Sequence, residues 1–206
     1  LAWGIDLPFD KNFVTYVWFD ALLNYASALG WPEGEKYTKY WPHVHHIIGK
    51  DILKTHGIYW PCMLKAAGLP VFKKLVVHGH WVVGGSKMSK SLGNSPDALK
   101  LIEQYSADGV RVGLLLSSAA GNDLMFDEAL CQQGKGFGNK IWNAFNLTNL
   151  WKINESIEQP ESSRIALEWY ESKFQQTLLD IEDHFSKYRL SDALMAIYKL
   201  IYDDFC

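Results

Sequence analysis

Along the first half of the chain, short continuous apolar runs alternate with segments in which apolar residues recur at helical spacing. Short runs rich in β-branched and aromatic residues predict strands at residues 14–19, 44–48 and 75–83. Helical spacing between these runs predicts helices at about 20–29 and 51–67. Because strands joined by crossover helices pair in parallel, this half predicts an α/β layer built on a parallel sheet.

From Asn94 onward the pattern is helical. Short helices are expected at 97–105 and 108–116, with Ser95 as N-cap and Pro96 as first residue of the earlier one. Further on, apolar residues recur every three or four positions, which is typical of the buried faces of a helical bundle. Residues 154–163 are the expected linker, and Ser191 is a candidate N-cap. We therefore expect a partial α/β domain over residues 1–125 and a partial helical bundle over 126–206.

Composition narrows the class of protein. A hydrophobic content of 48% and a charged content of 21% are ordinary for a globular protein, and no apolar run reaches membrane-spanning length. Cys62, Cys131 and Cys206 show no CxxC spacing, which argues against a disulfide framework and fits a cytoplasmic or organelle-matrix location. The net charge of −3 makes no strong case for or against nucleic-acid binding, and contact with RNA would need local lysine patches. Neither DNA nor a membrane is expected as a partner.

The most informative stretch is the glycine-flanked sequence GGSKMSKSLGN at residues 84–94. Lys87 and Lys90, separated by Met88 and Ser89 and followed by Ser91, form a cationic loop between a strand and a helix start. Each ammonium is a compact three-donor charge suited to the β- and γ-phosphates of a nucleotide, and the glycines allow the backbone to approach and move. The alternative is an exposed polar turn with incidental lysines, which the full motif in this context disfavours.

A second candidate site lies where the strand at 44–48 passes into a helix, the end of an α/β sheet at which ligands bind. Gly49 would let the backbone approach a nucleoside, and Asp51 could accept hydrogen bonds from the ribose hydroxyls of ATP. The alternative for Asp51 is a helix N-cap. His78, with His80, is interpreted as polar lining near the nucleotide; no metal site is expected, because no third ligand stands at a suitable spacing.

Two groups at helical spacing could wall an apolar amino-acid pocket in which a methionine thioether meets aromatic faces. The alternative is that these residues are ordinary core aromatics. The candidates are Trp18, Ala21, Tyr25, Ile52, His56 and Trp60.

These motifs resemble those of class I aminoacyl-tRNA synthetases, whose KMSKS signature matches residues 87–91. Residues 1–87 look like methionyl-tRNA synthetase, although Leu22 stands where some members carry proline. The later part, from about residue 94, looks closer to valyl-tRNA synthetase. The stretches that match methionyl-tRNA synthetase are 3–5 (WGI), 16–21 (YVWFDA), 46–52 (HIIGKDI), 60–61 (WP) and 77–80 (VHGH). Those that match valyl-tRNA synthetase are 109–113 (GVRVG), 120–123 (AGND) and 137–143 (FGNKIWN).

The resemblance implies the C-terminal half of a Rossmann-like catalytic domain, followed by the start of an anticodon-binding bundle. It implies ATP and Mg²⁺ as cofactors, tRNA and an amino acid as partners, and Lys87 and Lys90 as the catalytic pair. Methionine is the favoured amino acid, because the pocket residues fall in the methionine-like half; valine is the alternative. The family's other nucleotide motif is not found here, so we expect a fragment that does not activate an amino acid by itself.

Two alternatives from other classes stay open. One is a non-catalytic tRNA-binding module, which the intact Lys87 and Lys90 disfavour. The other is a different α/β nucleotidyltransferase with a similar lysine loop, which the aromatic groups around Trp18 and His56 disfavour.

Overall fold

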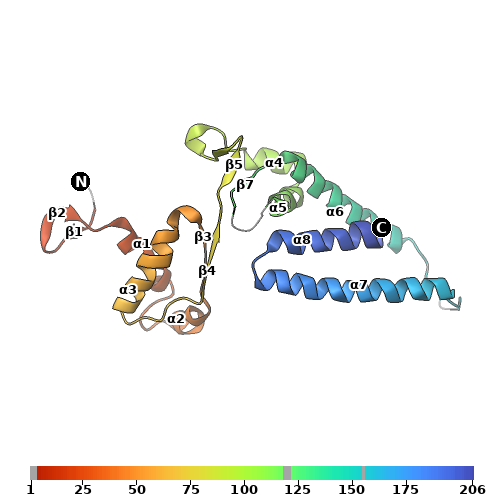
Figure 1. Ribbon diagram of the computed structural model, residues 1–206, viewed down its shortest axis with the longest axis horizontal. Coiled ribbons are helices and arrows are strands. Elements are labelled where there is room, and N and C mark those ends of the chain that lie inside the picture. The colour runs from red at the N-terminus through yellow and green to blue at the C-terminus, as the bar shows by residue number, and fades with distance from the viewer. Residues whose placement is uncertain (1–3, 118–121, 155) are drawn as a thin grey trace. The chain divides into compact units, whose positions relative to one another are not determined.

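A computed structural model describes residues 4–117, 122–154 and 156–206 of the chain (Figure 1). The chain divides into two compact units, Leu1–His78 and Gly79–Cys206, and each is described by itself. The domain boundary expected between residues 125 and 126 stays a prediction. Among the described residues, no helix is both long enough and apolar enough to cross a bilayer.

The first unit contains one parallel strand pair and helices that follow or precede it (Figure 1). Strands β3 and β4 run in parallel, from the pair His45–Lys74 to the pair Gly49–His78. The prediction of parallel pairing is therefore confirmed. In chain order the elements are β1 (Asp6–Leu7), β2 (Asp10–Val14), α1 (Val17–Ser27), α2 (Glu35–Tyr40), η1 (Trp41–His43), β3 (His45–Gly49), η2 (Lys50–Ile52), the π-helix η3 (Thr55–Tyr59), α3 (Trp60–Ala66) and β4 (Lys74–His78).

The strand expected at residues 14–19 is wrong beyond Val14, because α1 already begins at Val17. Trp18, Leu22 and Ala26 stand four residues apart, and Leu22 and Ala26 are each only 1% exposed. Burial of this helical face against the core outweighs the local strand preference of the β-branched and aromatic residues, which is a weak prior that packing overrides.

The core of the first unit is built around two tryptophans. Trp41 and Trp60 meet edge to face with ring centroids 6.2 Å apart, and Leu22, Ala26 and Leu64 pack against them. Trp41 also donates a hydrogen bond from Nε1 to the carbonyl of Pro70 at 2.9 Å, so its one polar atom is satisfied. This core packs α1 against α3, and a hydrogen bond from Trp60 to His46 links α3 to β3.

The second unit begins with a small sheet and continues as helices (Figure 1). Its strand order is β6-β5-β7, with β5 antiparallel to β6 and parallel to β7. The long strand expected at 75–83 is interrupted at Gly79 and His80, and its last part is a hairpin arm that leads into the lysine loop, as predicted. The elements are β5 (Trp81–Val83), β6 (Ser86–Lys87), η4 (Lys90–Leu92), α4 (Ala98–Tyr105), α5 (Ala107–Leu116), β7 (Leu124–Met125), α6 (Glu128–Asn149), α7 (Glu161–Ser186), α8 (Leu190–Lys199) and the π-helix η5 (Leu200–Phe205).

Both predicted serine caps are wrong. Helix α4 is capped by Asp97, whose carboxylate accepts a hydrogen bond from the Leu99 amide at 2.9 Å. Ser191 lies inside α8, and its hydroxyl donates to the carbonyl of Leu116 at 3.2 Å. An aspartate caps a helix at least as well as a serine, and the tertiary partner of Ser191 cannot be read from local sequence.

Helices α5 and α6 approach each other closely because glycines face the contact. A Cβ atom on Gly113 would lie 2.6 Å from the Cys131 amide nitrogen, and one on Gly134 would lie 2.6 Å from the Gly109 carbonyl oxygen. Real Cβ atoms do not come this close to backbone, so only glycine fits.

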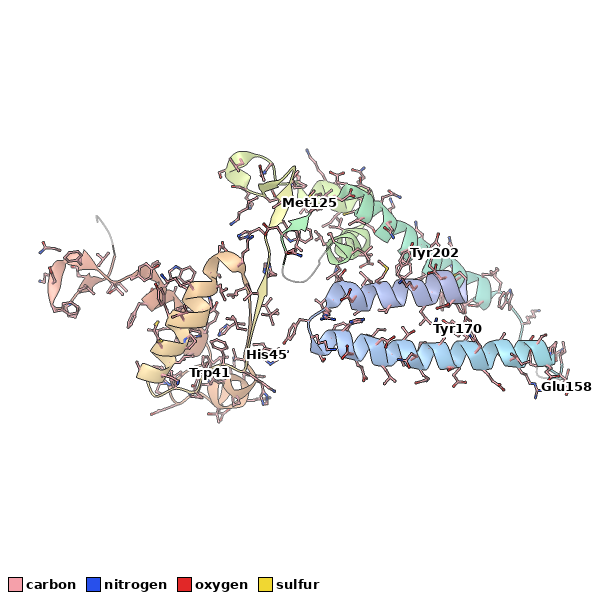
Figure 2. The ribbon with its side chains drawn as sticks, viewed as in Figure 1. Trp41, His45, Met125, Glu158, Tyr170 and Tyr202 are labelled. Atoms are coloured by element: carbon pink, nitrogen blue, oxygen red, sulfur yellow. The ribbon has the colours of Figure 1, made fainter. Side chains whose placement is uncertain are left out.

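The long helices confirm the predicted bundle. Helices α7 and α8 pack along each other, and Figure 2 shows Tyr170 on α7 and Tyr202 on η5. Tyr170 contacts Phe205, with ring centroids 5.6 Å apart, and the ammonium of Lys140 on α6 lies 3.3 Å from the centroid of the Tyr202 ring. Helices α6, α7, α8 and η5 thus pack together in the second unit, as the spacing of apolar residues indicates.

Candidate functional site

Three predicted nucleotide-binding residues lie together at the carboxyl end of the strand pair. Gly49 ends β3 and pairs in register with His78 at the end of β4. A Cβ atom on Gly49 would lie 2.7 Å from Oδ1 of Asp51 and 3.9 Å from Cε1 of His78. A side chain at position 49 would therefore occupy the space next to the Asp51 carboxylate. This is the edge of an α/β sheet at which ligands bind.

Asp51 is not a helix N-cap, so that alternative is wrong. The 3₁₀-helix η2 begins at Lys50, and Gly49 holds the cap position with no side-chain cap bond. Asp51 lies in the first turn with its side chain exposed. Its position beside Gly49 is compatible with a carboxylate that accepts hydrogen bonds from a ligand.

Four of the residues predicted to bind the amino acid, Trp18, Tyr25, His56 and Trp60, meet in one aromatic cluster formed by α1, η3 and α3. The Tyr25 hydroxyl lies 3.0 Å from Nε2 of His56, and the rings of Trp18 and His56 meet edge to face at 5.9 Å. Tyr25 also contacts Trp60, with ring centroids 6.1 Å apart. Ile52 takes part through its backbone, because its carbonyl lies 3.1 Å from Nδ1 of His56.

Burial divides these residues into two groups. His56 and Trp60 are 0% exposed, which agrees with the core-aromatic alternative for these two. Tyr25 is 39% exposed, Trp18 and Ile52 are half-buried, and Ala21 is exposed. The accessible surface of the cluster is thus formed by Tyr25 and Trp18, and His56 and Trp60 lie behind them.

The hydrogen bonds of the cluster define the protons on His56. A backbone carbonyl only accepts, so Nδ1 of His56 must donate to Ile52. In the neutral ring Nε2 is then an acceptor, and it receives the Tyr25 hydroxyl proton. The Tyr25 oxygen consequently keeps its lone pairs directed away from His56.

Sequence reasoning missed His46, which lies at the centre of the same cluster. Its Nε2 accepts a hydrogen bond from Nε1 of Trp60 at 3.1 Å, and its ring lies 4.6 Å from Tyr25 and 4.5 Å from Phe72 between centroids. Burial, with a smaller contribution from the charge of His56, lowers the pKa of His46 from 6.5 to about 4. The missed signal is the alternation along β3, where His46 and Ile48 share the buried face.

A separate apolar cavity of about 400 Å³ lies beside α1 and α3. Trp18 is the one predicted pocket residue that lines it, so the cavity does not coincide with the aromatic cluster. Its other lining residues are Tyr16, Phe19, Leu22, Tyr59, Cys62 and Met63.

The lysine loop is held by one asparagine. Oδ1 of Asn94 accepts a hydrogen bond from the Ser89 amide at 2.8 Å, and its Nδ2 donates to the Lys87 carbonyl at 3.1 Å. The hydroxyls of Ser89 and Ser91 are 2.7 Å apart. Asn94 therefore bridges Lys87 and Ser89, in the first part of the motif.

The hairpin presents both lysines on its surface. The Met88 amide donates to the Trp81 carbonyl at 2.8 Å, and Gly93 turns the chain with φ at +67°. Lys87 and Lys90 are exposed. The structure thus groups the candidate residues into two sets, one in each unit. Within the described ranges, no group of three His, Cys, Asp or Glu side chains is arranged to hold a metal ion.

The first unit thus contains a sheet edge with a glycine–carboxylate pair and an aromatic cluster, and the second unit contains a two-lysine loop. The family model described as "tRNA synthetases class I (M)" matches residues 1–144 of the chain. The chain belongs to the class I aminoacyl-tRNA synthetases.

Among curated relatives, the chain is 50% identical to a valine–tRNA ligase of Christiangramia forsetii, covering 98% of this chain and 23% of that one. It is 38% identical to a methionine–tRNA ligase of Caldanaerobacter subterraneus, covering 97% and 32%. Among solved structures it is similar to Mycobacterium tuberculosis methionyl-tRNA synthetase in complex with methionyl-adenylate, at a TM-score of 0.79 and 31% identity over 98% of this chain and 41% of that one. The chain thus spans about a quarter to two fifths of these relatives.

Proposed function

We propose that this chain supplies the ribose-binding edge, the amino-acid pocket and the phosphate-closing loop of a ligase that activates methionine with ATP and transfers it to tRNA. The observation that carries the choice of methionine is the aromatic cluster, in which Trp18 and Tyr25 are the accessible rings and His56 and Trp60 pack behind them. A flexible thioether makes favourable contacts with aromatic rings, and a short branched side chain would leave such a pocket partly empty.

In the first step, a carboxylate oxygen of the amino acid attacks the α-phosphorus of ATP. The bond from this phosphorus to the bridging oxygen breaks, and pyrophosphate leaves. Asp51 would accept hydrogen bonds from the ribose hydroxyls, with Gly49 leaving room for the nucleoside and His78 lining it. Positioning and neutralisation of charge are the main contributions a protein makes to such a reaction.

Lys87 and Lys90 would hold the departing pyrophosphate, together with the backbone of Met88 and the hydroxyls of Ser89 and Ser91. We expect Lys90 to contribute more, because it lies nearer the turn at Gly93 that precedes the helix. Mg²⁺ would share the neutralisation, with the phosphates themselves as its main ligands. In the second step, a hydroxyl of the terminal tRNA ribose attacks the carbonyl carbon of the adenylate, and AMP leaves.

Valine is the second candidate. At 50% identity, the valine–tRNA ligase of Christiangramia forsetii is more similar to this chain than the methionine–tRNA ligase of Caldanaerobacter subterraneus is, at 38%. The relatives divide between the two amino acids, so specificity has to be measured.

The test uses the completed enzyme, which we define as the Caldanaerobacter subterraneus methionine–tRNA ligase in which this chain replaces the region it matches. We expect ATP–pyrophosphate exchange that depends on methionine and falls strongly in the Lys90→Ala variant. The isolated 206-residue chain is expected to show no exchange. A completed enzyme that binds tRNA with steep salt dependence, but shows no exchange with any amino acid, would favour the non-catalytic tRNA-binding alternative.

A further inference from the structure

His46 belongs to the buried face of β3 and contacts three elements at once. It is 5% exposed, and it lies against Tyr25 of α1, Trp60 of α3 and His56 of η3. Among these neighbours, Tyr25 and His56 are the titratable ones. A polar ring at this depth needs a hydrogen-bond partner, and Trp60 supplies it.

The hydrogen bond from Trp60 determines the tautomer of His46. An indole N–H only donates, so Nε2 of His46 must be unprotonated and the neutral ring carries its proton on Nδ1. Protonation of Nε2 would remove the acceptor and place two donors face to face. The burial that lowers the pKa of His46 keeps the ring in the accepting form.

The imidazole ring of His46 also packs against the ring of Tyr25. Its centroid lies 4.6 Å from that of Tyr25, closer than the 5.8 Å between Tyr25 and His56. Phe72 also meets the His46 ring edge to face, with ring centroids 4.5 Å apart. His46 is thus clamped by Phe72 and in turn fixes the orientation of Tyr25 and Trp60.

We propose that His46 is a positioning residue for the amino-acid pocket, which orients Trp60 through Nε2 and supports the ring of Tyr25 without contacting the substrate. This inference rests on the proposed function only in identifying the cluster as the amino-acid pocket. It predicts that the geometry of the pocket depends on an acceptor at the position of Nε2, and not on the aromatic ring alone.

The first experiment tests the arrangement in the 206-residue chain without any assay of activity. Long-range ¹⁵N–¹H correlation spectra should show His46 as the Nδ1–H tautomer, and the Trp60 indole proton should exchange slowly. In His46→Leu this proton should exchange at least about tenfold faster, whereas His46→Gln, whose amide oxygen falls near the position of Nε2, should keep the protection. An Nε2–H tautomer, or equal protection in His46→Leu, would overturn the proposal.

The second experiment measures exchange kinetics in the completed enzyme, at a temperature where circular dichroism shows each variant folded. We expect His46→Leu to raise the KM for methionine by about tenfold, with kcat and the KM for ATP changed by less than about threefold, because a lost hydrogen bond misplaces one pocket wall. His46→Gln should restore the KM. His45→Leu, on the exposed face of β3, is the matched control.

The two proposals fail in different ways. If the unsubstituted completed enzyme shows no methionine-dependent exchange, the proposed function fails, and the spectra still decide the role of His46. If exchange is normal and His46→Leu leaves the KM for methionine unchanged, the positioning role is wrong while the proposed function stands. A loss of kcat and of both KM values together, unrelieved by glutamine, would indicate a general defect in folding and would also contradict the proposal.

Discussion

Replacing Gly49 by alanine should separate nucleotide binding from stability. The backbone at Gly49 has φ at −72° and ψ at 152°, which alanine adopts without strain. The added methyl group would lie 2.7 Å from Oδ1 of Asp51, so the carboxylate has to move. Because that atom is the end of an exposed side chain, we expect the free energy of unfolding to change by less than about 1 kcal/mol.

The cost should appear in the binding of ATP. A hydrogen bond to a charged group contributes about 1.5–3 kcal/mol, and each 1.4 kcal/mol corresponds to a factor of about ten. Displacing the Asp51 carboxylate from the ribose should therefore raise the KM for ATP about 10- to 100-fold, with the KM for methionine nearly unchanged. The assay is pyrophosphate exchange in the completed enzyme, with urea unfolding of the 206-residue chain beside it.

Gly136→Ala is the matched control. It lies in α6, and a Cβ atom there would meet no atom within 4 Å. This variant should keep the KM for ATP and gain about 0.5–1 kcal/mol of stability from its helix position. An unchanged KM for ATP in Gly49→Ala would refute the role assigned to the Gly49–Asp51 pair.

Three further predictions concern single positions. The pKa of His46 is lower in the folded chain than in the unfolded one, so the folded state binds fewer protons between pH 4 and 6.5. The free energy of unfolding should therefore rise with pH across this window, by up to about 3 kcal/mol. Urea unfolding at several pH values checks this, and a slope no steeper than that of His46→Gln would contradict it. Asn94→Ala should speed hydrogen exchange of the Ser89 amide by about tenfold and lower pyrophosphate exchange; equal protection would mean that Asn94 does not hold the loop. Gly113→Ala should cost at least about 2 kcal/mol in urea unfolding, because its Cβ would press on the backbone of Cys131, and a neutral result would show that α5 and α6 separate at little cost.

Much of the arrangement could be predicted from the sequence. The alternation of strand and helix patterns correctly indicated the parallel pair of β3 and β4, and apolar spacing correctly indicated the helices α6, α7 and α8. Prediction failed where tertiary burial decided the outcome. Residues 17–19 have strand-like side chains but lie in a helix, because Leu22 and Ala26 continue its buried face.

Within the candidate site, the sequence allowed us to identify residues whose side-chain chemistry suits the function. It did not allow us to identify the residues that contact them in the fold. Asp51 and the two lysines were recognisable from local motifs. His46 was not, because its role depends on Trp60, fourteen residues away, and on Tyr25 in another helix. Asn94 was recognised as the end of a motif, but its bridge between Ser89 and Lys87 is a property of the folded loop.

The central claim is that the aromatic cluster of the first unit selects methionine. The most direct test places this chain in two hosts, the methionine–tRNA ligase of Caldanaerobacter subterraneus and the valine–tRNA ligase of Christiangramia forsetii, in each case replacing the matched region. Pyrophosphate exchange is then measured with methionine and with valine. We predict methionine-dependent exchange in the first host, with valine inactive there. Valine-dependent exchange in the second host, together with no methionine-dependent exchange in the first, would contradict the assignment.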